Sequence, residues 1–177
     1  MKERHLPENC RETINTILKE TYGYEQFRNL EIYDDLSKGK EKLCISQGQL
    51  IENVILEAEK AWKGETQVDN ILLTAPTGSG KSLLFQLPAI YLGKEYNLLT
   101  IVVSPLKALI VDQVESLQEL GYTRVAYASS DLSPEQKMEV YRQVREGEID
   151  LFYLSPELLL SYDIKHFVGE RRIGLVV

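Results

Sequence analysis

One loop carries residues whose types and spacing are suited to binding phosphate groups. Residues 75–82, Ala-Pro-Thr-Gly-Ser-Gly-Lys-Ser, follow an apolar run at 71–73 and fit the pattern Gly-x-x-x-x-Gly-Lys-Ser/Thr, with alanine in the first position. Gly78 and Gly80 allow a turn whose N–H groups, together with the start of the following helix, can hold a polyphosphate. The fixed offsets disfavour the alternative, a plain turn between a strand and a helix.

The two residues that end this loop supply the remaining chemistry of a nucleotide site. The Lys81 ammonium can reach the β- and γ-phosphates, and the Ser82 hydroxyl can ligate Mg²⁺. A strand must precede the loop and a helix must follow it for these groups to converge. We therefore looked for that arrangement in the rest of the chain.

From residue 70 onwards, apolar runs of strand length alternate with amphipathic segments of helix length. Such alternation is typical of βα units that form a parallel sheet with helices on both faces. The predicted strands are 70–74, 98–103, 124–128, 150–154 and 173–177, and the predicted helices are 81–92, 106–120, 134–146 and 156–162. Within helix 134–146, Met138, Tyr141 and Val144 share one face. The fold class is α/β.

The N-terminal part of the chain is less regular. Residues 1–44 are predicted to form a mostly helical or irregular extension, with one helix that Gly23 ends and a charged loop at 34–42. A further helix is expected over 49–62. We therefore divide the chain into an extension, 1–44, and the start of an ATP-binding type of domain, 45–177.

Composition and charge exclude several classes of protein. The 177 residues carry a net charge of −7, which argues against binding of nucleic acid by bulk electrostatics, though not against a local groove. Cys10 and Cys44 match no metal-ligand spacing and predict small buried side chains in a reduced environment. No apolar stretch is long enough for a signal sequence or a membrane span. We expect a cytoplasmic protein, or a nuclear one if the source is eukaryotic, without membrane partners.

Small hydroxyl residues follow three of the predicted strands. In an open parallel sheet, ligands bind beyond the carboxyl ends of the strands. The segments there are Ser104-Pro105-Leu106-Lys107, Ser129-Ser130-Asp131 and Ser155-Pro156-Glu157. Their simplest role is to cap helices, yet free N–H groups at helix starts also bind backbone phosphates, so together they could follow a nucleic-acid strand.

Three ordered motifs resemble superfamily 2 helicases, and those of the RecQ family in particular. Residues 77–89 are similar to motif I, with a characteristic Phe-Gln-Leu-Pro-Ala end, residues 102–114 to motif Ia, and residues 152–157 to a later segment that lies along DNA. The resemblance covers roughly residues 45–177. It implies a RecA-like P-loop domain that uses ATP and Mg²⁺ and a full-length protein that moves on single-stranded DNA.

The resemblance also implies roles for individual residues. ATP and Mg²⁺ would be bound by the loop, with Lys81 as the catalytic group, and the strand-end residues would lie near single-stranded DNA. The nucleotide set is Thr77, Gly78, Ser79, Gly80, Lys81 and Ser82, with Ser82 also the metal ligand, and the nucleic-acid set is Ser104, Pro105, Lys107, Ser130, Ser155 and Pro156.

Two features depart from the family pattern. Gln49 resembles the glutamine that recognises the adenine edge in the family, and Gln47 is the alternative. A glutamine suits this edge because its amide both donates and accepts hydrogen bonds. In the family an aromatic-Gly-aromatic-x-x-Phe-Arg element directly precedes that glutamine, whereas here residues 22–28 carry it about twenty residues upstream, through an insertion or by accident. In addition, Leu158 replaces an arginine.

The last predicted strand, 173–177, resembles the one that an acidic Asp-Glu-x-His box follows in the family. We therefore expect the chain to be a piece of a longer protein, truncated before motif II and unable alone to hydrolyse ATP. The leading hypothesis is a DNA motor, and the alternatives are an RNA helicase, a double-strand translocase, or a non-motor nucleotide-binding interaction module with unknown protein partners. We interpret Arg171 and Arg172 as a solvated charge pair.

Overall fold

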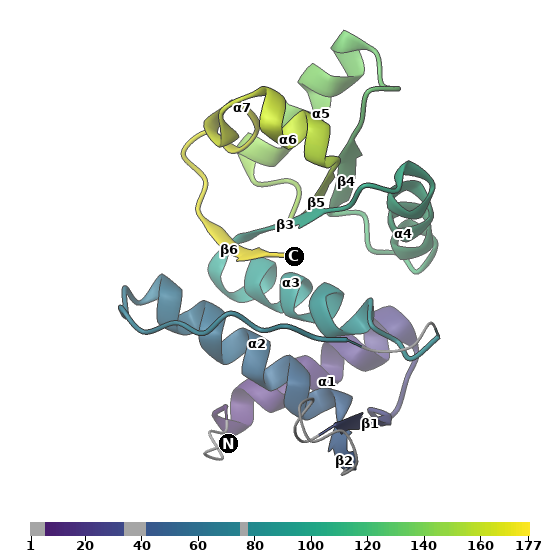
Figure 1. The fold of residues 1–177 in the computed structure, drawn as a ribbon, viewed down its shortest axis with the longest axis vertical. Helices are drawn as coiled ribbons and strands as arrows, with labels where there is room; N and C mark the ends of the chain where they lie inside the picture. The colour runs from purple at the N-terminus through teal and green to yellow at the C-terminus, as the bar shows by residue number, and fades with distance from the viewer. Residues whose placement is uncertain (1–5, 34–41, 75–77) are drawn as a thin grey trace. The chain divides into compact units, whose positions relative to one another are not determined.

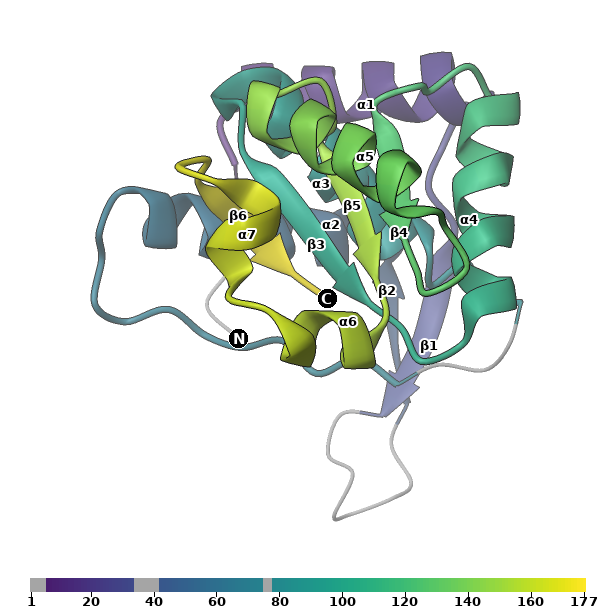
Figure 2. The same ribbon diagram turned by 90° about the horizontal axis from the view of Figure 1, so that it is seen from above.

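The computed structural model of this chain describes residues 6–33, 42–74 and 78–177. The chain divides after Pro88 into two units, residues 1–88 and 89–177. Helix α3, Leu83–Tyr96, contains that dividing point. Figures 1 and 2 label the elements of both units. The predicted boundary between residues 44 and 45 stays a prediction.

Two helices of the first unit confirm the sequence pattern. Helix α1, Glu8–Tyr22, ends at Gly23, which adopts the left-handed conformation with φ of 69° and can do so because it has no Cβ. Helix α2, Gln47–Trp62, begins two residues earlier than predicted, because Ser46 forms a capping box with Gln49.

A β-hairpin lies between these helices and was not predicted. Strand β1, Asn29–Tyr33, pairs antiparallel with β2, Lys42–Ser46, and Asn29 lies opposite Ser46. The alternation Asn-Leu-Glu-Ile in β1 was the signal for this strand, and the polar composition of the region around it hid that signal. On β2, Cys44 is exposed, so the prediction of a buried cysteine was wrong there.

The predicted strand 70–74 is not a strand in the structure. These residues have no regular secondary structure, and the side chains of Ile71 and Leu72 are 47% and 88% exposed. An apolar run predicts burial, but a strand also needs a neighbouring ladder of hydrogen bonds. The two sheets that the described residues form contain no partner for this segment.

The second unit contains a parallel four-stranded sheet in the order β4-β5-β3-β6, which confirms the predicted α/β architecture. The observed bounds of the predicted elements lie within a residue or two of those predicted, and one further short helix, α7, was not predicted. The elements are β3 Leu99–Val103, α4 Lys107–Glu119, β4 Val125–Ala128, α5 Pro134–Glu146, β5 Leu151–Leu154, α6 Pro156–Ser161, α7 Ile164–Val168 and β6 Ile173–Val176.

Apolar side chains from the strands and from α5 and α7 form the core of this unit. Phe152 on β5 and Phe167 on α7 are fully buried, and Tyr141 on α5 contacts both rings edge-on. Burial raises the pKa of the Tyr141 phenol. Val144 is buried on the same helix, whereas Met138 is 69% exposed. The predicted apolar face of α5 is therefore shorter than its spacing suggested.

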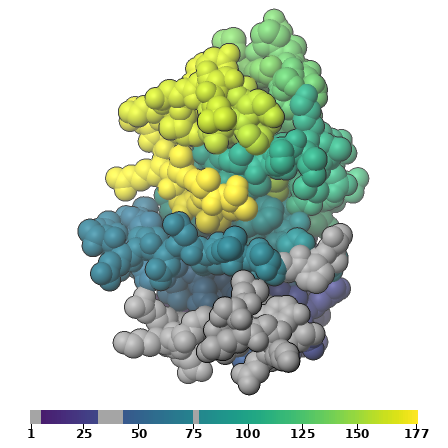
Figure 3. Space-filling view, in the orientation of Figure 1, coloured from purple at the N-terminus to yellow at the C-terminus, as the bar shows by residue number. Residues whose placement is uncertain are grey.

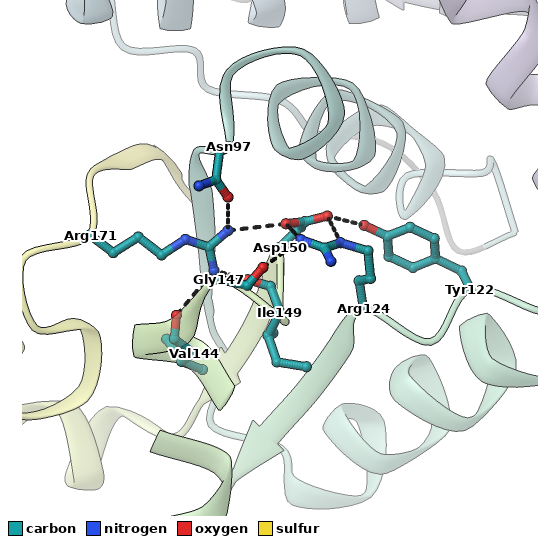
Figure 4. A network of polar contacts seen from close by, with 8 residues as sticks. All are labelled: Asn97, Tyr122, Arg124, Val144, Gly147, Ile149, Asp150 and Arg171. Carbon is teal, nitrogen blue, oxygen red and sulfur yellow. Dashed lines mark hydrogen bonds and ion pairs between the residues drawn. The ribbon is translucent and has the colours of Figure 1, made fainter. Parts of the chain in front are cut away.

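A cluster of polar residues lies at the amino ends of the four parallel strands, around the buried carboxylate of Asp150 (Figure 4). Asn97, Arg124, Asp150 and Arg171 each lie just before one of the strands β3, β4, β5 and β6. Arg124 donates to both oxygens of the Asp150 carboxylate, at 2.6 and 2.9 Å, and Arg171 donates to it at 3.0 Å. The Tyr122 hydroxyl adds a fourth hydrogen bond, at 3.0 Å.

Two guanidinium groups thus share one carboxylate. The excess positive charge faces the end of α5, where Arg124 donates to the carbonyl of Gly147 and Arg171 to that of Val144, and the carboxyl end of a helix favours cations. Burial lowers the pKa of Arg171, while the hydrogen bond to Asp150 raises that of Arg124. The Arg171 side chain is 5% exposed, so its interpretation as solvated was wrong.

Strand β6 lies at one edge of the sheet and β4 at the opposite edge. Among the described strands, β6 pairs with β3 alone. Its residues appear as yellow atoms on the surface in Figure 3, and Val176 is 62% exposed. In the described part of the chain, no helix has the length and apolar character that crossing a membrane requires.

Candidate functional site

The phosphate-binding loop has the backbone that its glycines predict. Gly78 and Gly80 both adopt positive φ, 80° and 77°, a conformation that costs other residues more. The chain then enters the first turn of α3, where the Lys81 carbonyl accepts the N–H of Leu84 and the Ser82 carbonyl accepts that of Gln86. Thr77 lies outside the described residues.

Lys81 and Ser82 therefore stand at the beginning of a helix, where the positive end of the helix dipole favours an anion. Lys81 is exposed, and Ser82 and Ser79 are half-buried. Two left-handed glycines followed by lysine and serine at a helix start fit a bound nucleotide with its Mg²⁺. These described residues thus fit the predicted cofactors ATP and Mg²⁺.

Gln47 is the glutamine that the structure brings to this loop. Its Nε2 donates to the Ser79 carbonyl at 3.3 Å, and its Oε1 accepts the Arg28 N–H at 3.1 Å. The side chain is 3% exposed. A Cβ placed on Gly80 would come within 2.6 Å of Gln47 Nε2, so a side chain at position 80 would displace this amide.

Gln49 has a different environment. It lies exposed on the first turn of α2, and its Oε1 accepts the Ser46 N–H at 3.0 Å as part of the capping box. Sequence spacing could not separate the two glutamines, because both are polar residues at the start of one helix. Recognition of adenine by either residue stays a prediction.

The aromatic element at residues 22–28 contacts Gln47 through its last residue, Arg28. The Gln47 N–H donates to the Arg28 carbonyl at 2.9 Å, just beyond the point where Asn29 of β1 lies opposite Ser46 of β2. The Arg28 guanidinium lies 6.0 Å from the centre of the Tyr24 ring. The structure thus places Arg28, the last residue of this element, next to Gln47. An insertion as the origin of the separation in sequence stays a prediction.

The second unit gathers the predicted nucleic-acid residues at the carboxyl ends of its strands. Ser104 follows β3, Ser130 follows β4 and Ser155 follows β5, and the Ser104 N–H donates to the Leu154 carbonyl at 3.0 Å. Pro105 and Lys107 are exposed beside Ser104, and Pro156 is half-buried. The parallel topology therefore places all six residues along one end of the sheet.

Lys107 links two of these strand ends. Its Nζ donates to the Ser130 hydroxyl and to Asp131 Oδ1, the latter at 2.9 Å. The hydrogen bond from Lys107 holds the pKa of Asp131 below its ordinary value. The sequence motifs included Asp131 only as the end of the segment Ser129-Ser130-Asp131, with no role of its own. The signal that could have identified its role is its charge, which is complementary to that of Lys107. A phosphate at Lys107 would replace this carboxylate.

Ser155 has the simpler of its two predicted roles in this structure. Its hydroxyl caps α6 by accepting the Leu158 N–H at 3.3 Å, and the side chain is buried. Glu157 follows in the same turn, and its own backbone N–H, then Ser155, lower the pKa of its carboxyl. Ser104 similarly accepts the Leu106 N–H, at 3.4 Å, but remains half-buried.

Comparison with known proteins identifies relatives that share these features. The family described as DEAD/DEAH box helicase matches residues 47–177. The ATP-dependent DNA helicase RecQ of Synechocystis is 32% identical over 93% of this chain and 28% of its own length. The ATP-dependent DNA helicase RecQ of Bacillus subtilis is 32% identical over 84% of this chain and 20% of its own length.

A plant relative has similar identity. The ATP-dependent DNA helicase Q-like 5 of Arabidopsis thaliana is 32% identical over 94% of this chain and 14% of its own length. The chain thus spans less than a third of the curated relatives that it matches. The family match covers the phosphate-binding loop and the strand-end residues together, and on that evidence the chain belongs to the DEAD/DEAH box helicase family, as a RecQ-like member.

Proposed function

We propose that this chain is the ATP-binding portion of a RecQ-like DNA helicase or translocase. In the full-length protein, ATP hydrolysis would be coupled to movement along single-stranded DNA. The observation that carries the proposal is the loop in which two left-handed glycines are followed by Lys81 and Ser82 immediately before α3. The relatives, which are named as ATP-dependent DNA helicases, support it.

In this proposal, each described residue of the nucleotide site has a separate task. The N–H groups around Gly78 and Gly80 hold the phosphates, Lys81 neutralises the β- and γ-phosphate charge, and Ser82 ligates Mg²⁺. Bound Mg-ATP supplies the phosphoanhydride bond whose hydrolysis drives movement.

Gln47, rather than Gln49, is proposed to contact the nucleobase. Its amide keeps a second N–H and a second lone pair beyond the bonds to Ser79 and Arg28, which is enough for an adenine edge. Arg28 is hydrogen-bonded to Gln47, and its guanidinium lies over the Tyr24 ring, so the two side chains offer flat surfaces for stacking.

The nucleic-acid strand is proposed to cross the carboxyl ends of β3, β4 and β5. Ser104 and Ser130 offer hydroxyls, and Lys107 offers a positive charge, to successive phosphates. These contacts are to the backbone, so binding should be largely independent of base sequence. Asp131 would release Lys107 when a phosphate arrives.

The deciding experiment is the steady-state ATPase activity of the full-length gene product, measured without polymer and with single-stranded DNA, duplex DNA or RNA. We expect strong stimulation by single-stranded DNA and loss of hydrolysis in Lys81→Ala. Stimulation by RNA alone would assign an RNA helicase, and stimulation by duplex alone a double-strand translocase. Mg-ATP binding without hydrolysis in any mixture would favour the non-motor module.

A further inference from the structure

A groove runs along the outer edge of strand β4, on the side away from β5. It has a volume of about 750 Å³ and is lined by residues of α4, β4 and α5, the elements that lie side by side in Figure 2. Its floor is apolar, with Val114 and Val125 buried and Val140 half-buried. None of the residues proposed to hold nucleotide or nucleic acid lines it.

Some backbone N–H and C=O groups of β4 point into this groove and not toward β5. The Leu151 N–H of β5 donates to the Arg124 carbonyl, and Val125 lies opposite Leu151 in the register. Because successive residues of a strand direct their N–H and C=O groups to alternate sides, Val125 and Tyr127 turn theirs away from β5. Among the described strands, β4 has β5 as its one neighbour.

The rim of the groove is acidic and amide-rich. Glu115 and Gln118 stand on α4, Glu135 and Gln136 stand on α5, and no lysine or arginine is among the lining residues. Both glutamates are exposed. A third carboxylate, Glu139, is paired with Arg142 at 2.7 Å, so the negative charge available to a ligand comes mainly from Glu115 and Glu135.

This combination selects among occupants. An acidic rim repels the phosphates of nucleic acid, and two copies of the chain joined through this edge would bring like charges together. An extended peptide, in contrast, can pair with an exposed strand through its backbone and place side chains on both sides. Basic side chains near its ends would meet Glu115 and Glu135.

We propose that the β4 groove binds an extended, basic segment of a partner protein, which adds a fifth strand to the sheet beside β4. The main-chain hydrogen bonds to Val125 and Tyr127 provide the register, the apolar floor accepts the central side chains, and the two glutamates select for positive charge. The residues that line this groove are distinct from those of the nucleotide loop and of the strand ends.

The test uses a fluorescein-labelled peptide, Lys-Lys-Val-Thr-Val-Lys-Lys, with its ends acetylated and amidated. Binding to the 177-residue chain is measured by fluorescence anisotropy at low salt. Two control peptides carry glutamate in place of lysine, or proline in place of the central threonine. We expect the basic peptide to bind about tenfold or more tightly than either control, since one lacks charge complementarity and the other lacks a donor.

Two pairs of variants locate the site. Glu115→Lys should weaken binding of the basic peptide by about threefold to tenfold, while Glu119→Lys, the same change on α4 outside the groove, should leave it within about twofold. Tyr127→Pro removes an N–H that faces away from β5, which an edge strand tolerates, and should abolish binding. Tyr127→Thr keeps that N–H and should bind.

Several outcomes would overturn the proposal. Equal binding of the three peptides would show that neither charge nor strand pairing matters, and equal effects of Glu115→Lys and Glu119→Lys would place the peptide elsewhere. Self-association that Tyr127→Thr retains and Tyr127→Pro loses would assign the edge to a second copy of the chain. A single-stranded oligonucleotide could compete with the peptide for the chain. If Glu115→Lys and Glu119→Lys both abolish that competition, peptide binding reflects general charge effects and not the groove. If Tyr127→Pro does not fold, the glutamate pair still decides.

Discussion

The two ends of the parallel sheet gather polar residues by the same topology and use them differently. At the amino ends, Asp150 is 2% exposed and accepts hydrogen bonds from two arginines and a tyrosine. At the carboxyl ends, Lys107 and Asp131 form a pair whose side chains are 47% and 69% exposed. The buried end fixes the strands to one another, while the exposed end has charges that a ligand can exchange.

The difference follows from the cost of burying charge. A buried carboxylate is stable only with its partners in place, so removing one partner is expensive. An exposed pair contributes little to stability, because water and salt replace it readily. Variants at the amino ends should therefore change stability, and variants at the carboxyl ends should change ligand binding.

The largest effect is expected for Asp150→Asn. The variant leaves Arg124 and Arg171 together without their carboxylate, and loss of a buried partner of this kind costs about 3–5 kcal/mol. The free energy of unfolding from urea titration measures it, with Asp112→Asn, an exposed change on α4, as the control. Equal stability of the two variants would contradict the view that the amino-end cluster holds the sheet together.

Arg171→Met should cost less, about 2–3 kcal/mol, because Arg124 still neutralises Asp150 while the hydrogen bonds to Val144 and Asn97 are lost. The neighbouring Arg172 is exposed, so Arg172→Met should stay within about 0.5 kcal/mol of the parent. Thermal unfolding of the two variants, which differ from the parent by the same change of residue type, measures the contrast. Similar melting temperatures of Arg171→Met and Arg172→Met would contradict a stabilising role for the buried Arg171.

In the first unit, Gln47 and Gln49 offer the same contrast between a buried and an exposed group. Gln47→Ala should weaken Mg-ATP binding by about tenfold, or about 1.4 kcal/mol, because Ser79 and Arg28 lose their shared partner. Gln49→Ala should leave the affinity nearly unchanged and cost helix α2 its capping box. Nucleotide fluorescence titration separates the two, and a larger loss of affinity in Gln49→Ala would reverse the assignment.

The smallest effects are expected at the carboxyl ends. Lys107→Ala should reduce binding of a single-stranded oligonucleotide by about threefold, whereas Asp131→Asn should increase it by about twofold, since it frees the lysine. Lys165→Ala, an exposed lysine of α7, controls for net charge. All three variants should unfold at nearly the parental urea concentration.

The effect of Asp131→Asn has a defined dependence on pH. Lys107 lowers the pKa of Asp131 in the folded chain, so the carboxylate stays charged through its ordinary titration range and is protonated only as pH falls through the lowered value. The difference in oligonucleotide affinity between parent and variant should therefore persist from about pH 8 down to about pH 4, near the ordinary pKa of an aspartate. Loss of about half of the difference at about pH 4 would show that Lys107 does not lower this pKa.

Much of the second unit could be predicted from the sequence. Helix α5 has the predicted bounds, because Ser133-Pro134 and Gly147 are local start and stop signals. The sheet follows from the alternation of strand and helix periods. The loop glycines likewise have the conformations that the motif requires. These features depend on residues close in the chain, so a pattern contains them.

Other features depend on residues that meet only in the folded chain. Residues 70–74 have the composition of a strand but no ladder partner among the described strands. Gln47 and Gln49 differ because the hairpin brings Arg28 to one of them. Arg171 is buried because the four parallel strands begin at the same end of the sheet, which places Asp150 next to Arg171.

The sequence by itself therefore determined most of the order of strands and helices in the second unit, the conformations of Gly78 and Gly80, and the family, since each rests on local spacing. The tertiary structure decided which glutamine contacts the loop, which charges are buried and which sheet edge is exposed in a groove. These outcomes depend on the burial and pairing of groups far apart in the chain, whose free energies no local pattern records.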